Sequence, residues 1–249
     1  MRVGRRFVAE RTLGFTESVI REMTRLASLH GAINLAQGYP DFAAPDEIKE
    51  AAVAAIRADL NQYAITWGAR ELREALSDAY RDRYAMAVDP ETMVTVTCGA
   101  TEAMIASLLA IVDPEDEVIV FEPFYENYGP DATLCGARPV FVPLRPPDFT
   151  FDRDQLAAAF SPHTKAIVVN TPNNPTGRVY PANTLEALAR VLTVASERHG
   201  RTIYVLSDEA YRRIIFDGRA FATPARFYPN TFVIYTYGKQ LLTPGQRLG

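Results

Sequence analysis

The amine of Lys239 is the side chain in this sequence that most suggests covalent chemistry. Lysine and arginine together number 26, and only three of these residues are lysines, Lys49, Lys165 and Lys239. Arginine cannot replace an amine that must form an imine, because its guanidinium stays protonated and is not nucleophilic. Lys239 stands between the apolar run FVIYTYG and a Gly/Pro turn, which indicates amine chemistry there. The alternative is chance, which Lys49 and Lys165 illustrate.

Two further segments could hold the phosphate of a ligand near this amine. Thr236 lies three residues before the lysine and Arg247 lies eight residues after it. The segment CGATE at 98–102 joins an expected strand to an expected helix, where Gly99 permits a tight turn and Thr101 can cap the helix. Free N–H groups at a helix start bind anions. Taken alone, this segment is better explained as a plain connection, and neither a dinucleotide fingerprint nor a P-loop is present.

Asp208 ends the apolar run IYVLS and is expected to be partly buried. A buried carboxylate needs a cationic or hydrogen-bonding partner, and a protonated ring nitrogen would serve. The alternative is that Asp208 caps a helix. Tyr211 could face the same way or pack in the core. The three histidines show no partner pattern, and no Ser/His/Asp order or GxSxG motif is present.

The elements that must position these residues alternate between strand and helix. Val- and Ile-rich runs predict strands, and amphipathic stretches predict helices. The expected strands are 93–99, 117–123, 138–144, 165–172, 203–209 and 232–239, and the expected helices are 45–60, 69–84, 100–112 and 183–199. This alternation is typical of an α/β fold, with a mostly parallel sheet flanked by helices. Because ligands bind outside the carboxyl ends of such strands, the loops after them should converge on one ligand.

Composition excludes several classes of protein. The 249 residues are 48% hydrophobic and carry a net charge of −4, which suits one large globular domain or one and a half and gives no reason to expect nucleic acid. No apolar run approaches the roughly 18 residues of a membrane span. Two cysteines without a Cys/His cluster predict no disulfide framework and no metal site, and they favour the cytoplasm. The basic N-terminus favours a solvated arm over a presequence.

Seven motifs, in this order, resemble those of the class I/II aminotransferases. They are INLAQGYPDF, QYAITWGARELREAL, TCGATEA, EPFYENY, NTPNNPTG, LSDEAYRRIIF and TYGKQLLTPGQRLG, and they extend from about Ile33 to Gly249. Enzymes of this family have the aspartate aminotransferase fold and use pyridoxal 5'-phosphate. The branch that this sequence is most similar to contains the kynurenine, glutamine and methionine aminotransferases.

The resemblance implies four catalytic residues. Lys239 matches the lysine that binds the cofactor as an internal aldimine and then shuttles the α-proton. Asp208 matches the aspartate that keeps the pyridine nitrogen protonated, so that the ring acts as an electron sink. Tyr211 and Asn174 match the residues that hydrogen-bond the phenolic oxygen of the ring, and Asn174 also reaches the substrate carboxylate.

The resemblance also implies binding residues and a partner. Tyr125 matches the aromatic residue stacked on the ring, and Gly38 matches a backbone position near the substrate carboxylate. Tyr63 matches a tyrosine given to the phosphate of a neighbouring subunit, which implies a homodimer. The residues that match the phosphate cup are Gly99, Ala100, Thr101, Thr236 and Arg247.

The sequence departs from the family pattern at its end. Gly249 lies inside a motif that in the family leads into an antiparallel strand between the first strand and the lysine strand. A C-terminal small domain of roughly 100–150 residues and its carboxylate-binding arginine would follow. We therefore expect a fragment, with residues 1–45 forming an N-terminal arm of the small domain, whose C-terminal part is missing, and residues 46–249 forming an incomplete cofactor-binding large domain.

The implied function is transfer of an amino group between an L-amino acid and a 2-oxo acid in amino acid metabolism and biosynthesis. A carbon–sulfur β-lyase that uses the same cofactor is an alternative, and a catalytically incomplete fragment is another. A ligand-sensing domain of a transcription regulator is disfavoured, because about 32 residues precede the first motif, too few for a DNA-binding module.

Overall fold

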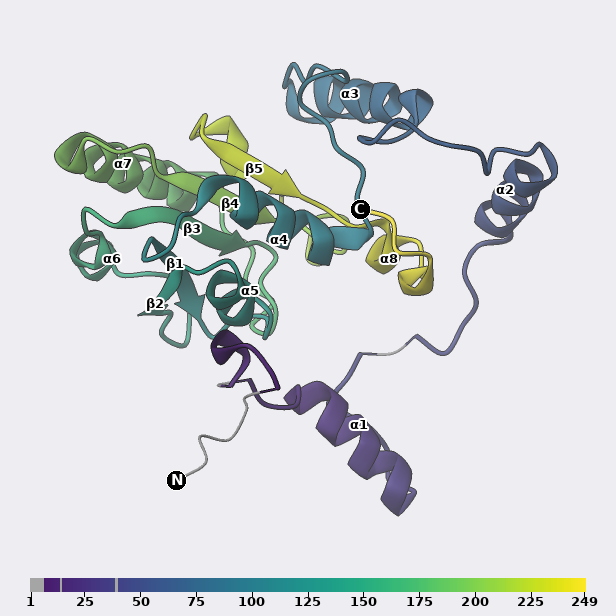
Figure 1. Ribbon diagram of the computed structural model, residues 1–249, viewed down its shortest axis with the longest axis horizontal. Coiled ribbons are helices and arrows are strands. Elements are labelled where there is room, and N and C mark those ends of the chain that lie inside the picture. The colour runs from purple at the N-terminus through teal and green to yellow at the C-terminus, as the bar shows by residue number, and fades with distance from the viewer. Residues whose placement is uncertain (1–6, 14, 39) are drawn as a thin grey trace. The chain divides into compact units, whose positions relative to one another are not determined.

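The computed structural model describes residues 7–13, 15–38 and 40–249, and the chain divides into two compact units, Met1–Ala43 and Ala44–Gly249 (Figure 1). The first unit contains a short 3-10 helix, η1 (Glu10–Thr12), and the helix α1 (Val19–His30). The hydroxyl of Ser18 accepts a hydrogen bond from the Arg21 N–H and so caps the start of α1. No residue of α1 is buried.

The second unit is built on a five-stranded sheet with the order β2-β1-β3-β4-β5. All four neighbouring pairs of strands are parallel, as the alternation of strands and helices predicts. The α/β fold expected from the sequence is thereby confirmed. The strands are β1 (Glu117–Glu122), β2 (Arg138–Pro143), β3 (Thr164–Asn170), β4 (Tyr204–Asp208) and β5 (Thr231–Ile234).

Helices precede, connect and follow these strands. The helices expected from periodicity at 45–60, 69–84, 100–112 and 183–199 are all present, with boundaries shifted by no more than three residues. Among the described residues, no helix has both the length and the apolarity needed to cross a membrane. The helices are α2 (Asp46–Arg57), α3 (Arg70–Tyr84), α4 (Gly99–Ile111), α5 (Tyr128–Leu134), α6 (Arg153–Ala159), α7 (Ala182–His199) and α8 (Tyr237–Gln240), with 3-10 turns η2 (Pro224–Arg226) and η3 (Pro244–Gln246).

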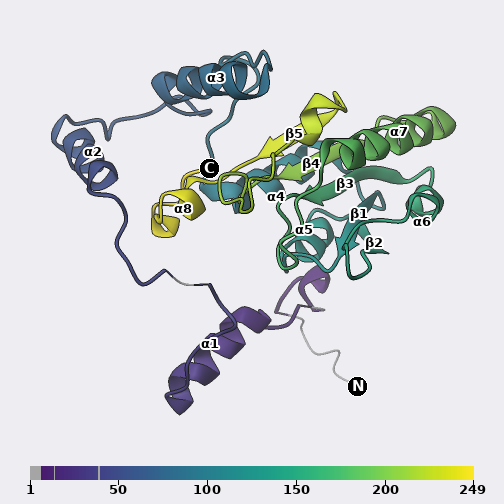
Figure 2. The same ribbon diagram turned by 180° about the vertical axis from the view of Figure 1, so that it is seen from behind.

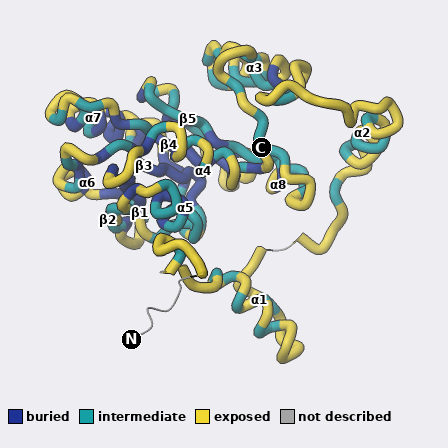
Figure 3. Tube along the Cα trace, viewed as in Figure 1, coloured by how far each residue is buried: buried dark blue, intermediate teal, exposed yellow. Residues whose placement is uncertain are grey.

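The sheet is buried on both faces because its strands alternate between two cores. In β1, Val118 and Val120 pack with α4 and α5, whereas Ile119 and Phe121 pack with α6 and α7. Figure 2 shows α7 in front of the sheet when the molecule is seen from behind, and Figure 3 shows the strands as the most buried part of the chain. This two-sided packing holds the carboxyl ends of the strands in fixed relative positions.

The expected strand at 93–99 is wrong. Within the described residues, this segment has no ladder of hydrogen bonds to another strand. Its backbone bonds go instead to two separate points: Val96 donates to the Trp67 carbonyl, and Thr97 exchanges two bonds with Gly249, of 2.8 and 3.0 Å. The apolar alternation of the segment is real, but a strand also requires a paired neighbour along its length.

Candidate functional site

A pocket lies where the loops that follow β1, β3, β4 and β5 meet the start of α4. This is the edge of a parallel sheet at which ligands are expected. The residues that line the pocket are Ala100, Thr101, Met104, Tyr125, Asn127, Tyr128, Asp131, Asn170, Asn174, Asp208, Ala210, Tyr211, Thr236, Gly238, Lys239, Pro244 and Arg247.

Most of the residues singled out in the sequence lie in this lining, but three do not. Gly99 is the first residue of α4 and directly precedes Ala100, which does line the pocket. Tyr63 is fully exposed and lies outside the pocket of its own chain. Gly38 belongs to the first unit. Of the three lysines, only Lys239 lines the pocket: Lys49 forms an ion pair with Asp46, and Lys165 lies over the ring of Tyr204.

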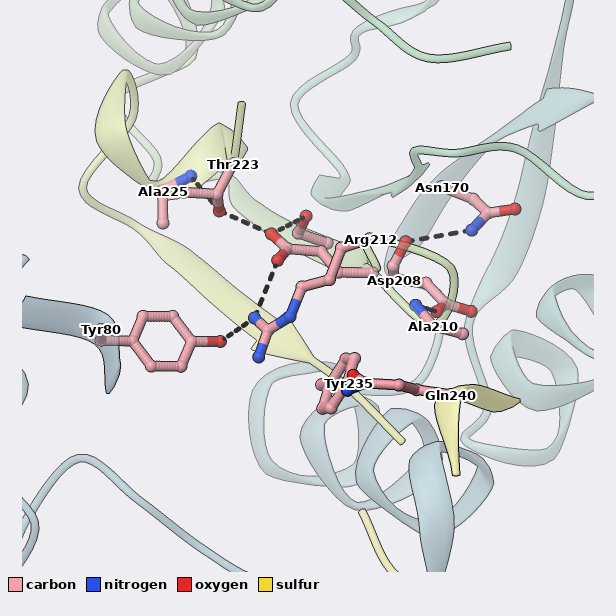
Figure 4. A network of polar contacts seen from close by, with 11 residues as sticks. Tyr80, Asn170, Asp208, Ala210, Arg212, Thr223, Ala225, Tyr235 and Gln240 are labelled. Carbon is pink, nitrogen blue, oxygen red and sulfur yellow. Dashed lines mark hydrogen bonds and ion pairs between the residues drawn. The ribbon is translucent and has the colours of Figure 1, made fainter. Parts of the chain in front are cut away.

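Asp208 ends strand β4, and only 8% of its surface is exposed. Its Oδ2 accepts a hydrogen bond of 2.6 Å from the hydroxyl of Tyr128, and its Oδ1 accepts one of 3.0 Å from the Ala210 N–H. Burial raises the pKa of the Asp208 carboxyl, while these two bonds and the charge of Lys239 act in the opposite direction. The side chain does not cap a helix, since residues 210–213 form a turn. Figure 4 shows Asp208 beside Ala210.

Tyr128 is a site residue that the sequence reasoning missed. It lies three residues after Tyr125, and the two rings meet edge to face at 5.8 Å. Burial and the charge of Asp208 hold the pKa of the Tyr128 phenol well above its usual value, so the phenol keeps its proton and donates to the carboxylate. Helical spacing from Tyr125 was the only signal available, and one of 12 tyrosines does not stand out by type.

We expect the substitution Tyr128→Phe to raise the pKa of Asp208 further, because a donor to its charged form is lost. A hydrogen bond to a charged group contributes about 1.5–3 kcal/mol, which corresponds to roughly one to two pKa units. If binding of pyridoxal phosphate requires the ionised carboxylate of Asp208, the pH below which binding is lost should rise by about that amount. A pH series of cofactor titrations measures it. Tyr180→Phe, at a buried tyrosine of the other core, should leave the limit in place.

Lys239 lies in the short helix α8, directly beyond the end of β5. The hydroxyl of Thr236 caps this helix by accepting from the Gly238 N–H at 3.3 Å, and it donates to the Leu248 carbonyl at 3.1 Å. The Lys239 Nζ lies 5.7 Å from the centroid of the Tyr211 ring. Lys239 and Tyr211, brought from different strands, therefore approach each other at the pocket.

The start of α4 forms a cup that can hold an anion. The first N–H groups of a helix have no partners within it and point outward. The Arg247 guanidinium reaches this turn and donates to the Cys98 carbonyl at 3.3 Å. Gly99 has a φ of +77°, a backbone conformation that favours glycine, and a Cβ there would lie 2.7 Å from Nη2 of Arg247, so a larger residue would also displace the end of that arginine from the cup. Thr101 lines the pocket but does not cap the helix, because the N-cap position is Cys98.

Asn174 is fixed by a bond to the strand that precedes it. Its backbone N–H donates to Oδ1 of Asn170 at 2.6 Å. Nδ2 of Asn170 in turn donates to the Asp208 carbonyl at 3.0 Å, as Figure 4 shows. Asn170 thus joins the loop after β3 to the end of β4. The sequence reasoning missed this bracing role, because the NTPNNPTG motif drew attention to its later asparagines.

Asp131 is a second buried carboxyl in the pocket lining, with 7% of its surface exposed. Within the described residues, its Oδ2 is buried without a hydrogen-bond partner. Burial raises the pKa of Asp131 to about 6 from 3.8. Between these two values the folded chain holds a proton that the unfolded chain has lost, so the free energy of unfolding falls as the pH rises through this interval and then stays level above it.

We therefore expect Asp131→Asn to stabilise the chain at pH 8, by at most about 2–3 kcal/mol, and to change it little near pH 4. The neutral amide avoids burial of a charge, and that benefit exists only where the aspartate would be ionised. Urea unfolding of both chains at the two pH values measures the difference. An equal difference at both values would show that the charge of Asp131 is not the cause.

Comparison with known proteins gives a consistent result. Residues 30–249 match the profile of a family described as aminotransferase class I and II. The chain is 40% identical over 205 residues to a probable N-succinyldiaminopimelate aminotransferase of Mycobacterium tuberculosis, covering 82% of this chain and 50% of that protein. It is 35% identical to kynurenine–oxoglutarate transaminase 1 of Homo sapiens, covering 92% of this chain and 56% of that protein.

A solved structure extends the similarity to three dimensions. A crystal structure from Escherichia coli, identified with a methionine aminotransferase function, has a TM-score of 0.90 and 32% sequence identity. The match covers 98% of this chain and 63% of that one. The chain thus spans about half the length of the curated relatives it matches.

Proposed function

Because the chain belongs to the class I and II aminotransferases, we propose that it transfers an amino group between an L-amino acid and a 2-oxo acid with pyridoxal phosphate as its cofactor. One observation carries the proposal. The amine of Lys239 and the buried carboxylate of Asp208 line the same pocket as the first turn of α4. An amine, an acid and an anion cup are the groups that a phosphorylated pyridine aldehyde requires.

The residues present fit each part of this cofactor. The first turn of α4 and the guanidinium of Arg247 suit the phosphate. Asp208 suits a protonated ring nitrogen, and the ring of Tyr125 supplies a flat apolar surface beside it. When bound there, the cofactor supplies an aldehyde for the amine and an electron sink for the α-carbon of the substrate.

The residues of the chain then have separate roles in moving protons and in orienting the bound molecules. Lys239 takes a proton from the substrate α-carbon and returns one later, as general base and acid. Asp208 stays ionised, with help from Tyr128, and holds a proton at the ring nitrogen. Tyr211 and Asn174 hold the ring oxygen by hydrogen bonds, and Asn174 also orients the substrate carboxylate.

The proposed assembly is a homodimer in the cytoplasm. The full exposure of Tyr63 supports the dimer, because that side chain is available to the phosphate cup of a second copy. Gly38 is proposed to approach the substrate carboxylate, and residues 1–45 to belong to the small domain. The two cysteines, both unpaired, support a reducing compartment.

The experiment that tests this function is a single-turnover assay. The 249-residue chain is loaded with pyridoxal phosphate, freed of excess cofactor, and mixed with single L-amino acids. We expect loss of the visible band of the bound cofactor and release of one 2-oxo acid per cofactor. Subsequent addition of a second 2-oxo acid should restore the band.

Two other outcomes would count against the proposal. Pyruvate and ammonia from a cysteine conjugate, without any 2-oxo acid acceptor, would indicate the β-lyase reaction instead. A chain that remains folded by circular dichroism and binds no cofactor would contradict both reactions.

A further inference from the structure

A buried arginine lies beside the proposed site without lining its pocket. Arg212 follows Tyr211 in the sequence, and 9% of its surface is exposed. Three tyrosine rings surround its guanidinium carbon, at centroid distances of 3.9 Å for Tyr235, 5.0 Å for Tyr80 and 5.6 Å for Tyr84. Figure 4 shows the guanidinium between Tyr80 and Tyr235. Each distance lies within the range of a cation–π contact.

Glu209 neutralises this arginine and is itself completely buried. Its Oε2 accepts from Nη1 of Arg212 at 3.2 Å, and its Oε1 accepts from the hydroxyls of Ser207 at 3.0 Å and Thr223 at 2.5 Å. Every oxygen of the carboxylate is thus engaged, so the ion pair has one defined geometry. The pair therefore fixes the guanidinium relative to strand β4.

The guanidinium of Arg212 contacts the chain just beyond the point where the pairing of β4 with β5 ends. The ladder between β4 and β5 ends at the pair Asp208–Ile234, after which the Glu209 N–H makes one last bond of 2.8 Å to the Ile234 carbonyl. The next residue, Tyr235, leaves the ladder and lays its ring on Arg212. Its hydroxyl then donates to Oε1 of Gln240 at 2.5 Å. The side chain of Arg212, from the turn that follows β4, thereby contacts a segment that starts at Tyr235 and ends at Gln240, one residue beyond the lysine.

Helix α3 is held by the same group. Nη1 of Arg212 donates to the Tyr80 hydroxyl, and the Tyr80 ring contacts that of Tyr84 at 5.5 Å. The arginine thus joins α3, β4 and the segment after β5, although these three elements are far apart in the sequence.

We propose that Arg212 is a positioning residue. It fixes the orientation of the lysine segment, residues 235–240, relative to the Asp208 carboxylate at the end of β4. The inference rests on the proposed function, since it assigns to Arg212 the placement of Lys239 and Thr236 relative to Asp208 and Tyr211. Arg212 touches neither cofactor nor substrate. It acts through Tyr235, whose ring it holds, and through Gln240, to which Tyr235 donates.

The test compares two buried arginines replaced in the same way. Arg212→Lys keeps the positive charge for Glu209 but loses the flat guanidinium face that holds Tyr235. Arg73→Lys is the matched control, because Arg73 is fully buried in α3 and bonds to the Gly68 and Pro90 carbonyls, outside this network. A double variant, Arg212→Met with Glu209→Gln, removes both charges and leaves no unpaired carboxylate behind.

Two readouts separate positioning from stability. The first is amide hydrogen exchange of a peptide covering 235–243 in the cofactor-free chain. The second is the dissociation constant for pyridoxal phosphate, together with the pH midpoint of its visible band. Both Arg212→Lys and Arg73→Lys should lower the thermal unfolding midpoint. Only the Arg212 variants should speed exchange in 235–243, weaken cofactor binding about tenfold, or about 1.4 kcal/mol, and shift the pH midpoint.

The outcomes distinguish the inference from the function on which it rests. If the unsubstituted chain binds no pyridoxal phosphate, the proposed function fails, and hydrogen exchange still judges the role of Arg212. If Arg212→Lys and Arg73→Lys give the same exchange in 235–243 and the same cofactor affinity, Arg212 only stabilises the fold and the positioning role is overturned.

Discussion

Replacing Lys239 by arginine is expected to abolish covalent attachment of pyridoxal phosphate and to reduce transamination by at least about 10²–10⁴-fold, the range for loss of a positioned general base. The charge and the length of the side chain are nearly kept, so the fold should survive. The amine is lost, because a guanidinium neither forms an imine nor accepts a proton near neutral pH. The variant therefore isolates the chemistry of the amine from its charge.

Borohydride reduction followed by peptide mapping measures this effect directly. In the unsubstituted chain the label should appear on the peptide that contains Lys239. Lys49→Arg and Lys165→Arg are matched controls, since the former amine pairs with Asp46 and the latter lies over the Tyr204 ring. Both controls should retain the label in full. A label found on Lys49 or Lys165 would contradict the assignment of Lys239.

The substitution Asp208→Asn is expected to change activity and stability in opposite directions. The neutral amide cannot hold a proton at the ring nitrogen, so transamination should fall by about 10²–10³-fold, the range for removal of one preorganised electrostatic group. The cofactor-free chain should become more stable at neutral pH, because Asp208 is a carboxylate whose burial raises its pKa. A function that needs a buried charge destabilises the fold that carries it.

The pH dependence gives the sign of this stability effect. A carboxyl group whose pKa is higher in the folded chain favours folding most below its ordinary value, about 3.9, and loses that contribution as the pH rises through the folded value. The thermal midpoint of Asp208→Asn should therefore exceed that of the unsubstituted chain at pH 7.5, by about 2–4 °C per kcal/mol, and approach it at pH 4. A lower midpoint at pH 7.5 without cofactor would mean that Tyr128 and Ala210 more than offset the burial of the charge.

The sequence predicted the architecture well because each signal was local. The Val- and Ile-rich runs from Glu117 to Ile234 each contain a strand, since a buried parallel strand needs only a short apolar stretch. Lys239, Asp208 and Tyr211 could be placed together because all three follow such runs, and strand ends of a parallel sheet share one edge.

The parts that escaped prediction depend on partners distant in the sequence. The role of Tyr128 depends on its hydrogen bond to Asp208, which is 80 positions away. The role of Arg212 depends on its contact with Tyr80, which is 132 positions away. Neither residue type is unusual for its local setting. The prediction of a strand at 93–99 was wrong for the same reason, because the alternation of apolar residues is local whereas a strand is defined by its pairing with a neighbouring strand.

The contact between the start of α4 and Arg247 also determines when the anion cup can form during translation. The guanidinium donates to the Cys98 carbonyl, and the two residues are 149 positions apart. At 5–20 residues per second, a ribosome needs roughly 7–30 s to make the chain between them. Helix α4 and the sheet can form during that interval, but the anion cup lacks its arginine. A nascent chain therefore acquires the complete cup only after Arg247 has left the ribosome.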